Sequence, residues 1–342
     1  MKGIILAGGS GTRLYPLTLV TSKQLLPVYD KPMIYYPLST LMLAGIKDIL
    51  VISTPADTPR FKELLGDGSQ FGINLSYKVQ PTPDGLAQAF TLGEDFINGE
   101  PCAMVLGDNI FYGNGFTDLL KNAAEDAQKG KATVFGYYVN DPERFGVVDF
   151  DENGNAVSIE EKPEHPKSNL ASMGIYIFNW KQLRKALILD MTAEGSHHDF
   201  GKDIIPNFLN ADKRLYAYKF EGYWKDVGTI DSLWEANMDL LNKNNELNLD
   251  DPNWKIYTED IPTLPHYVGP TGKVEHCYIN QGAVIRGHAV DSVLFNNVDI
   301  DEDAFVSQAV LMPNVKVGKG AKIYRAIVAD GVKIDDGAVV GS

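Results

Sequence analysis

The hydrophobic positions follow two patterns, one before and one after about residue 250. In the first part, short apolar runs alternate with amphipathic segments. We predict β-strands at residues 3–6, 48–53, 103–106 and 133–138, and helices at residues 36–44 and 116–128. This alternation is typical of an α/β fold, with a Rossmann-like, mixed but mostly parallel sheet. Ligands bind at the carboxyl ends of the strands in such sheets, so we expect functional residues there.

The last part of the chain repeats with a period of 17 residues. Residues 292–308, 309–325 and 326–342 align without gaps. Four columns hold apolar or small residues: Val293, Val310 and Ile327; Val298, Val315 and Val332; Ile300, Val317 and Ile334; Ala304, Ala321 and Ala338. This period predicts a parallel β-helix, with three short strands in each coil and small residues at the corners. Residues 277–291 are expected to form an imperfect first coil, giving three or four coils; an irregular set of strands is the alternative.

These patterns predict three parts. Residues 1–242 would form the α/β domain, residues 243–270 a linker and residues 271–342 the β-helix. The repeat resembles the short left-handed β-helix of hexapeptide-repeat proteins. The end of its last coil has no obvious cap, and we expect the protein to be a homo-oligomer, a tetramer or a dimer.

Charge and cysteine content narrow the functional classes. The formal net charge of −14 argues against a nucleic-acid or membrane-surface partner, because both are anionic. No run approaches the roughly 20 apolar residues that cross a bilayer, and the first apolar run is too short for a signal peptide. Cys102 and Cys277 lie far apart in the sequence without metal-ligand spacing. We interpret both as buried thiols of a cytoplasmic protein.

A glycine-rich stretch, LAGGSGTRL at residues 6–14, follows the first predicted strand. Glycines let the backbone approach a phosphate so that consecutive N–H groups converge on its oxygens. Arginine adds a guanidinium fork for a triphosphate. The candidate nucleotide-binding residues here are Leu6, Gly8, Gly9, Gly11, Thr12 and Arg13. Taken alone, the stretch is also compatible with an ordinary turn.

A second stretch, SKQLLPVYDKPM at residues 22–33, follows closely. Together the two stretches resemble the signature of the sugar-nucleotide pyrophosphorylases. With IYYPL at residues 34–38 and QPTPDGLAQA at residues 80–89, the resemblance over residues 1–165 is to bacterial glucose-1-phosphate thymidylyltransferases. It implies a Mg²⁺-dependent transfer from a nucleoside triphosphate to glucose 1-phosphate. Arg13 and Lys23 would stabilise the triphosphate, and pyrophosphate would leave by in-line displacement.

One carboxylate is expected at the end of a strand. Asp108 lies in VLGDN at residues 105–109, and its oxygens suit Mg²⁺. An aspartate that only makes a turn is the alternative. The resemblance implies that Asp226, in GYWKDVGT at residues 222–229, is the second metal ligand.

The resemblance also implies a sugar-phosphate site. Lys162, in EEKP at residues 160–163, would hold the phosphate, and Glu161 the sugar hydroxyls. Gly146 and Gly174 would place backbone against the hexose. Ser172 departs from the residue that short thymidylyltransferases usually have near the sugar.

The base is expected to be read by the first half of the chain. By the resemblance, Gln80 hydrogen-bonds the pyrimidine edge, and Pro83, Gly85 and Leu86 line the base. A side-chain amide offers a donor to a carbonyl and an acceptor to a ring N–H, which suits thymine or uracil. We therefore favour dTTP, with UTP tolerated, over ATP.

From about Glu161 the resemblance changes to bacterial ADP-glucose pyrophosphorylase (glucose-1-phosphate adenylyltransferase). It rests on PEHPKS, ASMGIYIF, HDFGKD, WKDVGT and SLWEAN, at residues 163–168, 171–178, 198–203, 224–229 and 232–237. The adenylyltransferases carry a β-helix and the short thymidylyltransferases do not. A natural or engineered chimera would explain the mosaic, and ATP is then the alternative nucleotide.

Two other classes remain open. A hexapeptide-repeat acyltransferase would use His276 or His288 as its base. A regulatory or inactive chimera would bind sugar nucleotides without turnover.

Overall fold

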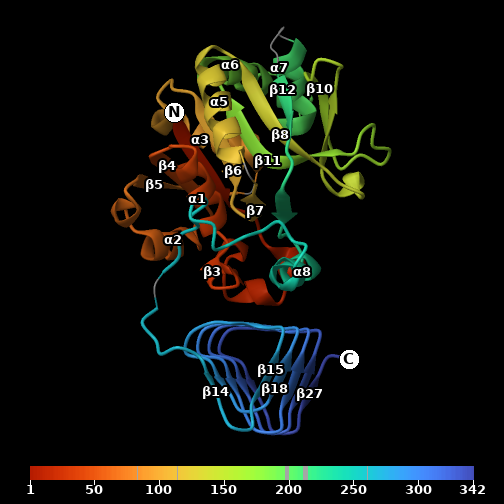
Figure 1. Ribbon diagram of the computed structural model, residues 1–342. Helices are drawn as coiled ribbons and strands as arrows, with labels where there is room; N and C mark the ends of the chain where they lie inside the picture. The colour runs from red at the N-terminus through yellow and green to blue at the C-terminus, as the bar shows by residue number, and fades with distance from the viewer. Residues whose placement is uncertain (83, 114, 197–199, 211–214, 260) are drawn as a thin grey trace. The chain divides into compact units, whose positions relative to one another are not determined.

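The computed structural model describes residues 1–342 except residues 83, 114, 197–199, 211–214 and 260 (Figure 1). The chain divides into two compact units. Unit 1 contains Met1–Ser10, Tyr36–Trp224 and Asp251–Lys255. Unit 2 contains Gly11–Tyr35, Lys225–Asp250 and Ile256–Ser342. The glycine-rich stretch is thus shared between the units, and so is GYWKDVGT.

Unit 1 is built on a nine-stranded mixed sheet. β1 pairs in parallel with β4 and β6, and β4 pairs in parallel with β5. β11 pairs antiparallel with β6, β8 and β9. The strands are β1 (Lys2–Ala7), β4 (Asp48–Ser53), β5 (Asn74–Val79), β6 (Cys102–Leu106), β8 (Ala132–Tyr138), β9 (Gly146–Phe150), β10 (Ala156–Glu161), β11 (Leu170–Phe178) and β12 (Leu215–Lys219). The carboxyl ends of β1, β4, β5 and β6 therefore meet at one edge of the sheet.

Helices and short connections complete this region. The helices are α1 (Tyr35–Leu43), α2 (Thr58–Leu65), α3 (Gly85–Leu92), α4 (Glu94–Ile97), α5 (Phe116–Gln128), α6 (Trp180–Met191) and α7 (Ile205–Asn210). A π-helix, η6 (Phe200–Ile204), precedes α7, and 3₁₀ turns form η4 (Ser69–Phe71) and η5 (Pro142–Arg144). A separate two-stranded sheet joins β7 (Asn109–Tyr112) to β13 (Tyr223–Asp226). The predicted strands and helices agree with the structure to within one residue at each end.

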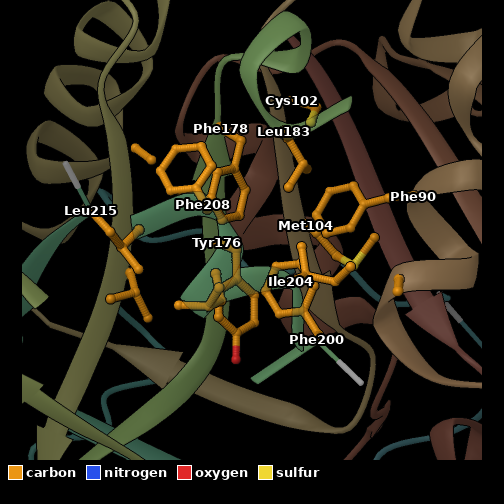
Figure 2. Close-up of a cluster of buried hydrophobic side chains, with 14 of the residues drawn as sticks. Phe90, Cys102, Met104, Tyr176, Phe178, Leu183, Phe200, Ile204, Phe208 and Leu215 are labelled. Atoms are coloured by element: carbon orange, nitrogen blue, oxygen red, sulfur yellow. The ribbon is translucent and has the colours of Figure 1, made fainter. Parts of the chain in front are cut away.

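An aromatic core holds the sheet of unit 1 against its helices (Figure 2). Phe90 of α3 stacks on Phe200, with ring centroids 5.5 Å apart, and meets Phe178 of β11 edge to face. Leu6 and Leu86 pack against the same cluster. The core therefore supports two segments of the predicted nucleotide site, the end of β1 and the start of α3.

Unit 2 contains the β-helix, whose strands form three parallel sheets (Figure 1). The first sheet has β14 (Tyr267–Val268), β17 (Val284–Ile285), β20 (Asp299–Ile300), β23 (Lys316–Val317) and β26 (Lys333–Ile334). The second has β15 (Lys273–Glu275), β18 (His288–Val290), β21 (Phe305–Ser307), β24 (Lys322–Tyr324) and β27 (Val339–Val340). The third, which we call sheet F, has β16 (Tyr278–Ile279), β19 (Val293–Leu294), β22 (Val310–Leu311) and β25 (Ile327–Val328). This is the arrangement of the predicted left-handed β-helix.

The coils confirm the predicted repeat and extend it. Val293 pairs with Val310, 17 residues on, whereas Tyr278 pairs with Val293, only 15 residues on. The coil at residues 277–291 is therefore the imperfect one that was expected. The sequence interpretation missed an earlier strand. Tyr267 of β14 lies inside the expected linker, and it pairs with Val284 of β17. The three or four expected coils were too few, since two of the sheets have five strands.

The corners differ from the expectation of small residues. At one corner His276, Asp291, Gln308 and Arg325 all have positive φ, between 42° and 52°. This backbone is costly for residues other than glycine. Contacts compensate at three of them: His276 bonds to the Leu241 carbonyl, Trp234 bonds to the Gln308 carbonyl, and Arg325 lies over the Trp234 ring. The corner residues are large because they bind the segment that packs on the β-helix.

The segment that packs on sheet F comes from the first part of the chain. α8 (Ile230–Met238) begins with a capping box between Thr229 and Ser232 and leads into η7 (Asp239–Leu241). Val293, Phe295 and Val310 form a buried cluster with Leu241, and Tyr29, Trp234 and Met238 pack against it. Other short elements of unit 2 are η1 (Thr12–Leu14), η2 (Leu17–Leu19), η3 (Lys23–Leu25), β2 (Pro27–Val28) and β3 (Lys31–Pro32). The predicted domain boundaries at residues 242 and 271 remain a prediction.

Candidate functional site

Three segments of unit 1 meet at the carboxyl edge of its parallel strands. Gly8 follows β1 directly, Gln80 follows β5, and Asp108 follows β6 after one glycine. These strands run parallel in the order β6, β1, β4 and β5, so the three segments lie at the same edge of the sheet. That the residues at this edge are functional stays a prediction.

Gln80 is tied to α3 by both hydrogens of its amide. Its Nε2 donates to the Gly85 carbonyl at 3.2 Å and to Gln88 Oε1 at 2.7 Å. Its Oε1 is turned towards Gly8, where an added Cβ would lie 3.1 Å away. The interpretation from sequence gave Gln80 a donor and an acceptor for the base. In the structure the donor half is used within the chain.

Asp108 is buried beside a chain of hydrogen bonds. Asn109 Nδ2 donates to Asp108 Oδ1 at 3.1 Å, and Asn109 Oδ1 accepts from Trp224 Nε1 at 2.8 Å. Trp224 also packs against Phe145 and Tyr137. The carboxylate is therefore held by a neighbour whose own amide is oriented by an indole.

The far end of β7 is anchored by the segment Asp251–Lys255. Tyr112 Oη donates to Asp251 Oδ2 at 2.8 Å, and the buried Trp254 ring stacks on Phe116. Burial, together with the Asp251 carboxylate, raises the pKa of Tyr112 to about 12. The phenol is thus a stable donor at neutral pH, and it fixes the strand that begins at Asn109.

The predicted sugar-phosphate residues form a group on β9, β10 and β11. Gly146 pairs with Glu161, and an added Cβ at Gly146 would lie 3.1 Å from Glu161 Oε2 and 3.8 Å from Ser172 Cβ. Lys162 Nζ lies 3.5 Å from Glu161 Oε1, and both side chains are exposed. Lys162 has a φ of +46°, which turns the chain at the end of β10. The structure brings these four residues together.

Gly174 has a packing role of its own. Its φ is +71°, and an added Cβ would lie 2.7 Å from Leu106 Cδ1. The pairing of β11 with β8 shifts register between Ser172 and Tyr176, whose hydroxyls lie 2.8 Å apart. Only glycine fits this irregularity, with or without a sugar nearby. Pro83, and His198 and Asp199 of the HDFGKD motif, lie outside the described residues.

In unit 2 the glycine-rich stretch continues into the 3₁₀ turn η1. Gly11 has a φ of +61°, and its carbonyl accepts from Thr18 Oγ1 at 2.8 Å. Thr12 and Arg13 are exposed on η1, which buried Leu14 anchors. An added Cβ at Gly11 would lie 3.6 Å from Lys23 Cβ, so Lys23 starts next to this turn.

Arg13 and Asp226 lie on either side of Gly228. An added Cβ at Gly228 would be 3.0 Å from Arg13 Nη2 and 3.5 Å from Asp226 Oδ2. The guanidinium of η1 and the carboxylate of β13 thus both lie next to Gly228, where an added side chain would crowd the guanidinium. Glycine at residue 228 was not recognised as a site residue from sequence, although it lies within GYWKDVGT.

The carboxylates fit a magnesium ion that arrives with a nucleotide. Among the described residues no group of three or more His, Cys, Asp or Glu side chains could hold a metal. Mg²⁺ usually keeps water ligands and takes one or two protein carboxylates together with substrate phosphates. Asp108 and Asp226 were predicted to be such carboxylates; they belong to different units, and both their role and their pairing stay a prediction.

The histidines proposed for acyl transfer have structural partners. His276 bonds to Asp291 at 2.6 Å and to the Leu241 carbonyl at 2.7 Å. His288 Nε2 lies 3.0 Å from Glu275, and its ring meets Phe305 edge to face. These contacts explain both residues without catalysis.

The cysteines are free thiols, but only one is buried as predicted. Cys102 lies in β6, and burial raises its pKa to about 12. Cys277 is partly exposed at the start of a coil, and its Sγ–H donates to the Glu275 carbonyl. The expectation that Cys277 is buried was therefore wrong, because side chains in the first coils of the β-helix are partly exposed.

Sequence reasoning missed three positions that the structure links to the site: Gln88, Asn109 and Gly228. Each lies next to a predicted residue or within its motif. Their roles depend on side-chain contacts across segments, which no spacing in the sequence displays.

Comparison with known proteins identifies two regions. Residues 2–243 match the family model for nucleotidyl transferases, and residues 265–342 match the model for a GlmU-like C-terminal hexapeptide region. A glucose-1-phosphate thymidylyltransferase of Neisseria gonorrhoeae is 59% identical over 238 residues, covering 69% of this chain and 81% of that protein. The enzyme of the same name from Xanthomonas campestris is 56% identical over 236 residues, covering 69% and 79%.

Another relative matches more of the chain. A glucose-1-phosphate adenylyltransferase of Clostridium acetobutylicum is 40% identical over 320 residues, which cover 89% of this chain and 84% of that protein. The similarity to the thymidylyltransferases extends over 236 to 238 residues, well past the seam expected near Glu161. A chimera therefore stays a hypothesis. In the part of the chain that the structure describes, no helix combines the length and apolar character that a membrane crossing requires.

Proposed function

Because the chain belongs to the nucleotidyl transferase family, we propose that it is a glucose-1-phosphate thymidylyltransferase. It would convert dTTP and glucose 1-phosphate into dTDP-glucose and pyrophosphate. The observation that supports this most is the placement of Gly8, Gln80 and Asp108 at one sheet edge, in a chain 50–59% identical to thymidylyltransferases. UTP is the expected secondary substrate, since uracil has the same hydrogen-bonding edge.

The reaction is a direct displacement at phosphorus. A phosphate oxygen of glucose 1-phosphate attacks the α-phosphorus of dTTP, and the bond from that phosphorus to the bridging oxygen of the leaving pyrophosphate breaks. The attacking oxygen is already ionised at neutral pH, so no side-chain nucleophile is needed. The protein must bring two anions together and stabilise the charge that develops.

Each charged residue has an expected role in that step. Arg13 and Lys23, which start from adjacent turns of unit 2, would stabilise the triphosphate and the leaving pyrophosphate. Lys162 would hold the attacking phosphate, and Glu161 would bind sugar hydroxyls. Asp108 and Asp226 would hold Mg²⁺, which neutralises phosphate charge when bound. The backbone of Gly8, Gly9 and Gly11 would approach the phosphates closely.

The second candidate function is adenylyl transfer from ATP. It is favoured by the match to the Clostridium acetobutylicum enzyme, which covers 89% of this chain and so extends into the β-helix. We expect the base to be chosen by Gln80 and Gly85 and not by the β-helix, and these residues lie in the region matched by the nucleotidyl transferase family model.

Pyrophosphate release tests the assignment. The protein is incubated with Mg²⁺, glucose 1-phosphate and, separately, dTTP, UTP, ATP or GTP. Fast release with dTTP and slow release with ATP is expected. Faster release with ATP would establish the second candidate, and no release from folded protein would support a regulatory or inactive chimera.

Assembly and location are also proposals. The homo-oligomer, a tetramer or a dimer, would be checked by light scattering, and a monomer would contradict it. The cytoplasmic location remains a prediction from cysteine usage.

A further inference from the structure

We propose that Gln88 is a positioning residue that determines which bases the site accepts. It would do so by fixing the side-chain amide of Gln80, so that the base meets a hydrogen-bond acceptor and not a donor. This inference rests on the proposed function, in which Gln80 lies at the edge of the nucleotide base.

The orientation of the two amides follows from a carboxylate at the end of the chain of hydrogen bonds. Gln88 Nε2 donates to Asp84 Oδ2 at 2.7 Å, and the same carboxylate oxygen accepts from the Thr82 hydroxyl. An ionised carboxylate can only accept. Gln88 must therefore point its nitrogen towards Asp84 and its oxygen towards Gln80.

The orientation of the Gln88 amide in turn fixes the orientation of the Gln80 amide. Gln88 Oε1 lies 2.7 Å from Gln80 Nε2, and the Gly85 carbonyl, which also can only accept, lies 3.2 Å from that nitrogen. A primary amide has two N–H groups, and both are used here. A flipped Gln80 would place its oxygen against two other oxygens, which is unfavourable.

The remaining atom of the amide, Gln80 Oε1, faces the start of the glycine-rich stretch. It is turned towards Gly8, close enough that an alanine at residue 8 would crowd it. The Gln80 side chain is 5% exposed and its backbone N–H donates to the Ser53 carbonyl at 2.8 Å. A buried, oriented acceptor discriminates strongly, because an unmatched partner there loses its water without gaining a bond.

The acceptor matches some bases and rejects others. Thymine and uracil carry an N–H at ring position 3, which can donate to Gln80 Oε1. Cytosine has an unprotonated nitrogen at the same position and would face the oxygen with a lone pair. UTP and CTP differ only at this edge, so their relative use reports the orientation of Gln80 without a change in ring size.

Two substitutions of Gln88 separate orientation from packing. Gln88→Leu removes the acceptor for Gln80 Nε2. Gln88→Glu, made together with Asp84→Asn so that no two carboxylates face each other, keeps an acceptor of the same length. We expect Gln88→Leu to lower the ratio of kcat/KM for UTP to kcat/KM for CTP by about tenfold, the equivalent of one mismatched hydrogen bond. The double variant with Gln88→Glu should keep the wild-type ratio. Thermal unfolding of both variants reports on folding.

A second variant tests the origin of the polarity. Asp84 is exposed, and Asp84→Asn leaves a group that can either donate or accept at this position. It should also lower the UTP to CTP ratio, by less than Gln88→Leu. An unchanged ratio in Gln88→Leu, or an equal fall in Gln88→Leu and in the double variant with Gln88→Glu, would overturn the proposal. Failure of the proposed function is a separate result, because it would appear in the wild type as a preference for ATP or as no release with dTTP and UTP.

Discussion

The indole Nε1 of Trp224 donates a 2.8 Å hydrogen bond to Oδ1 of Asn109, and the other end of that amide holds the carboxylate of Asp108. Trp224 lies two residues before Asp226 in the sequence. One short network of hydrogen bonds thus joins Asp108, through Asn109, to Trp224. Such partners behind a ligand set its orientation and its affinity for the metal.

Trp224→Phe should impair the use of Mg²⁺ while leaving the fold intact. Phenylalanine keeps aromatic contact with Tyr137 and Phe145 but cannot donate to Asn109. We expect the Mg²⁺ concentration for half-maximal pyrophosphate release to rise by roughly 10-fold or more. Trp234→Phe is a matched control, since it removes an indole donor to the Gln308 carbonyl instead. Equal behaviour of the two variants would contradict the role of Asn109.

Gly228→Ala should mimic the loss of Arg13. The new methyl group would lie 3.0 Å from Arg13 Nη2 and would displace the guanidinium. We expect turnover to fall on the order of 10²-fold, as for a lost charge-stabilising donor. A double-mutant cycle with Arg13→Ala checks the cause, because Gly228→Ala should cost little more once Arg13 is absent. Additive losses of turnover would mean that Gly228→Ala does not act through Arg13. Near-normal turnover of Arg13→Ala itself would refute the role of the arginine.

Lys162→Ala should weaken the binding of glucose 1-phosphate selectively. A charged hydrogen bond to a phosphate is worth about 1.5–3 kcal/mol, so the KM for glucose 1-phosphate should rise at least tenfold. The KM for dTTP should change little. Lys167→Ala, an exposed lysine in the same segment, is the control. A rise in the KM for dTTP instead would indicate that Lys162 binds the nucleotide and not glucose 1-phosphate.

Asp48→Asn should reduce stability at neutral pH but not in acid. Hydrogen bonds from Lys2 and Asn74 hold the pKa of Asp48 below its ordinary value of 3.8. A depressed pKa in the folded state stabilises the fold above the unfolded pKa, and this contribution is lost as the pH falls through the folded pKa. The pair is partly exposed, so the difference at pH 7 should be about 1 kcal/mol or less.

Urea unfolding of wild type and Asp48→Asn at pH 7 and near pH 3 measures this contribution. Asp95→Asn is the comparison, because that side chain is almost fully exposed. A difference that persisted unchanged in acid would show that Asp48 acts through something other than its charge.

The sequence predicted the elements better than it predicted the contacts between them. The strand at Asp48–Ser53 and the helix at Phe116–Gln128 were placed to the residue, since their apolar periodicity and the turns that bound them are local. The 17-residue repeat was equally readable. The strand at Tyr267–Val268 was missed because it comes one coil before the repeat becomes regular and its side chains are exposed.

The candidate site residues were predicted from motifs, whereas the residues that hold them in place were not. Gly8 and Asp108 were predicted because each follows a predicted strand, and Gln80 was predicted from the resemblance to the thymidylyltransferases. Gln88 and Asn109 were not, because a glutamine on a helix and an asparagine after an aspartate carry no signal alone. The partners of the corner residue His276, which are Asp291 and the Leu241 carbonyl, were not predicted either, since they become neighbours only when the β-helix folds.

At the C-terminal face of the β-helix Val332 is exposed, whereas its counterparts in the two preceding coils, Val315 and Val298, are buried. Each coil presents the next with the same backbone edge. The length of the β-helix can therefore change only by whole coils. One inserted unit of 17 residues at this face would lengthen it by one strand spacing, about 4.8 Å. The cluster around Phe295 and Leu241 would be untouched. Evolution can therefore adjust the reach of this module in discrete steps, whereas a shift of one residue would turn its interior side chains outwards.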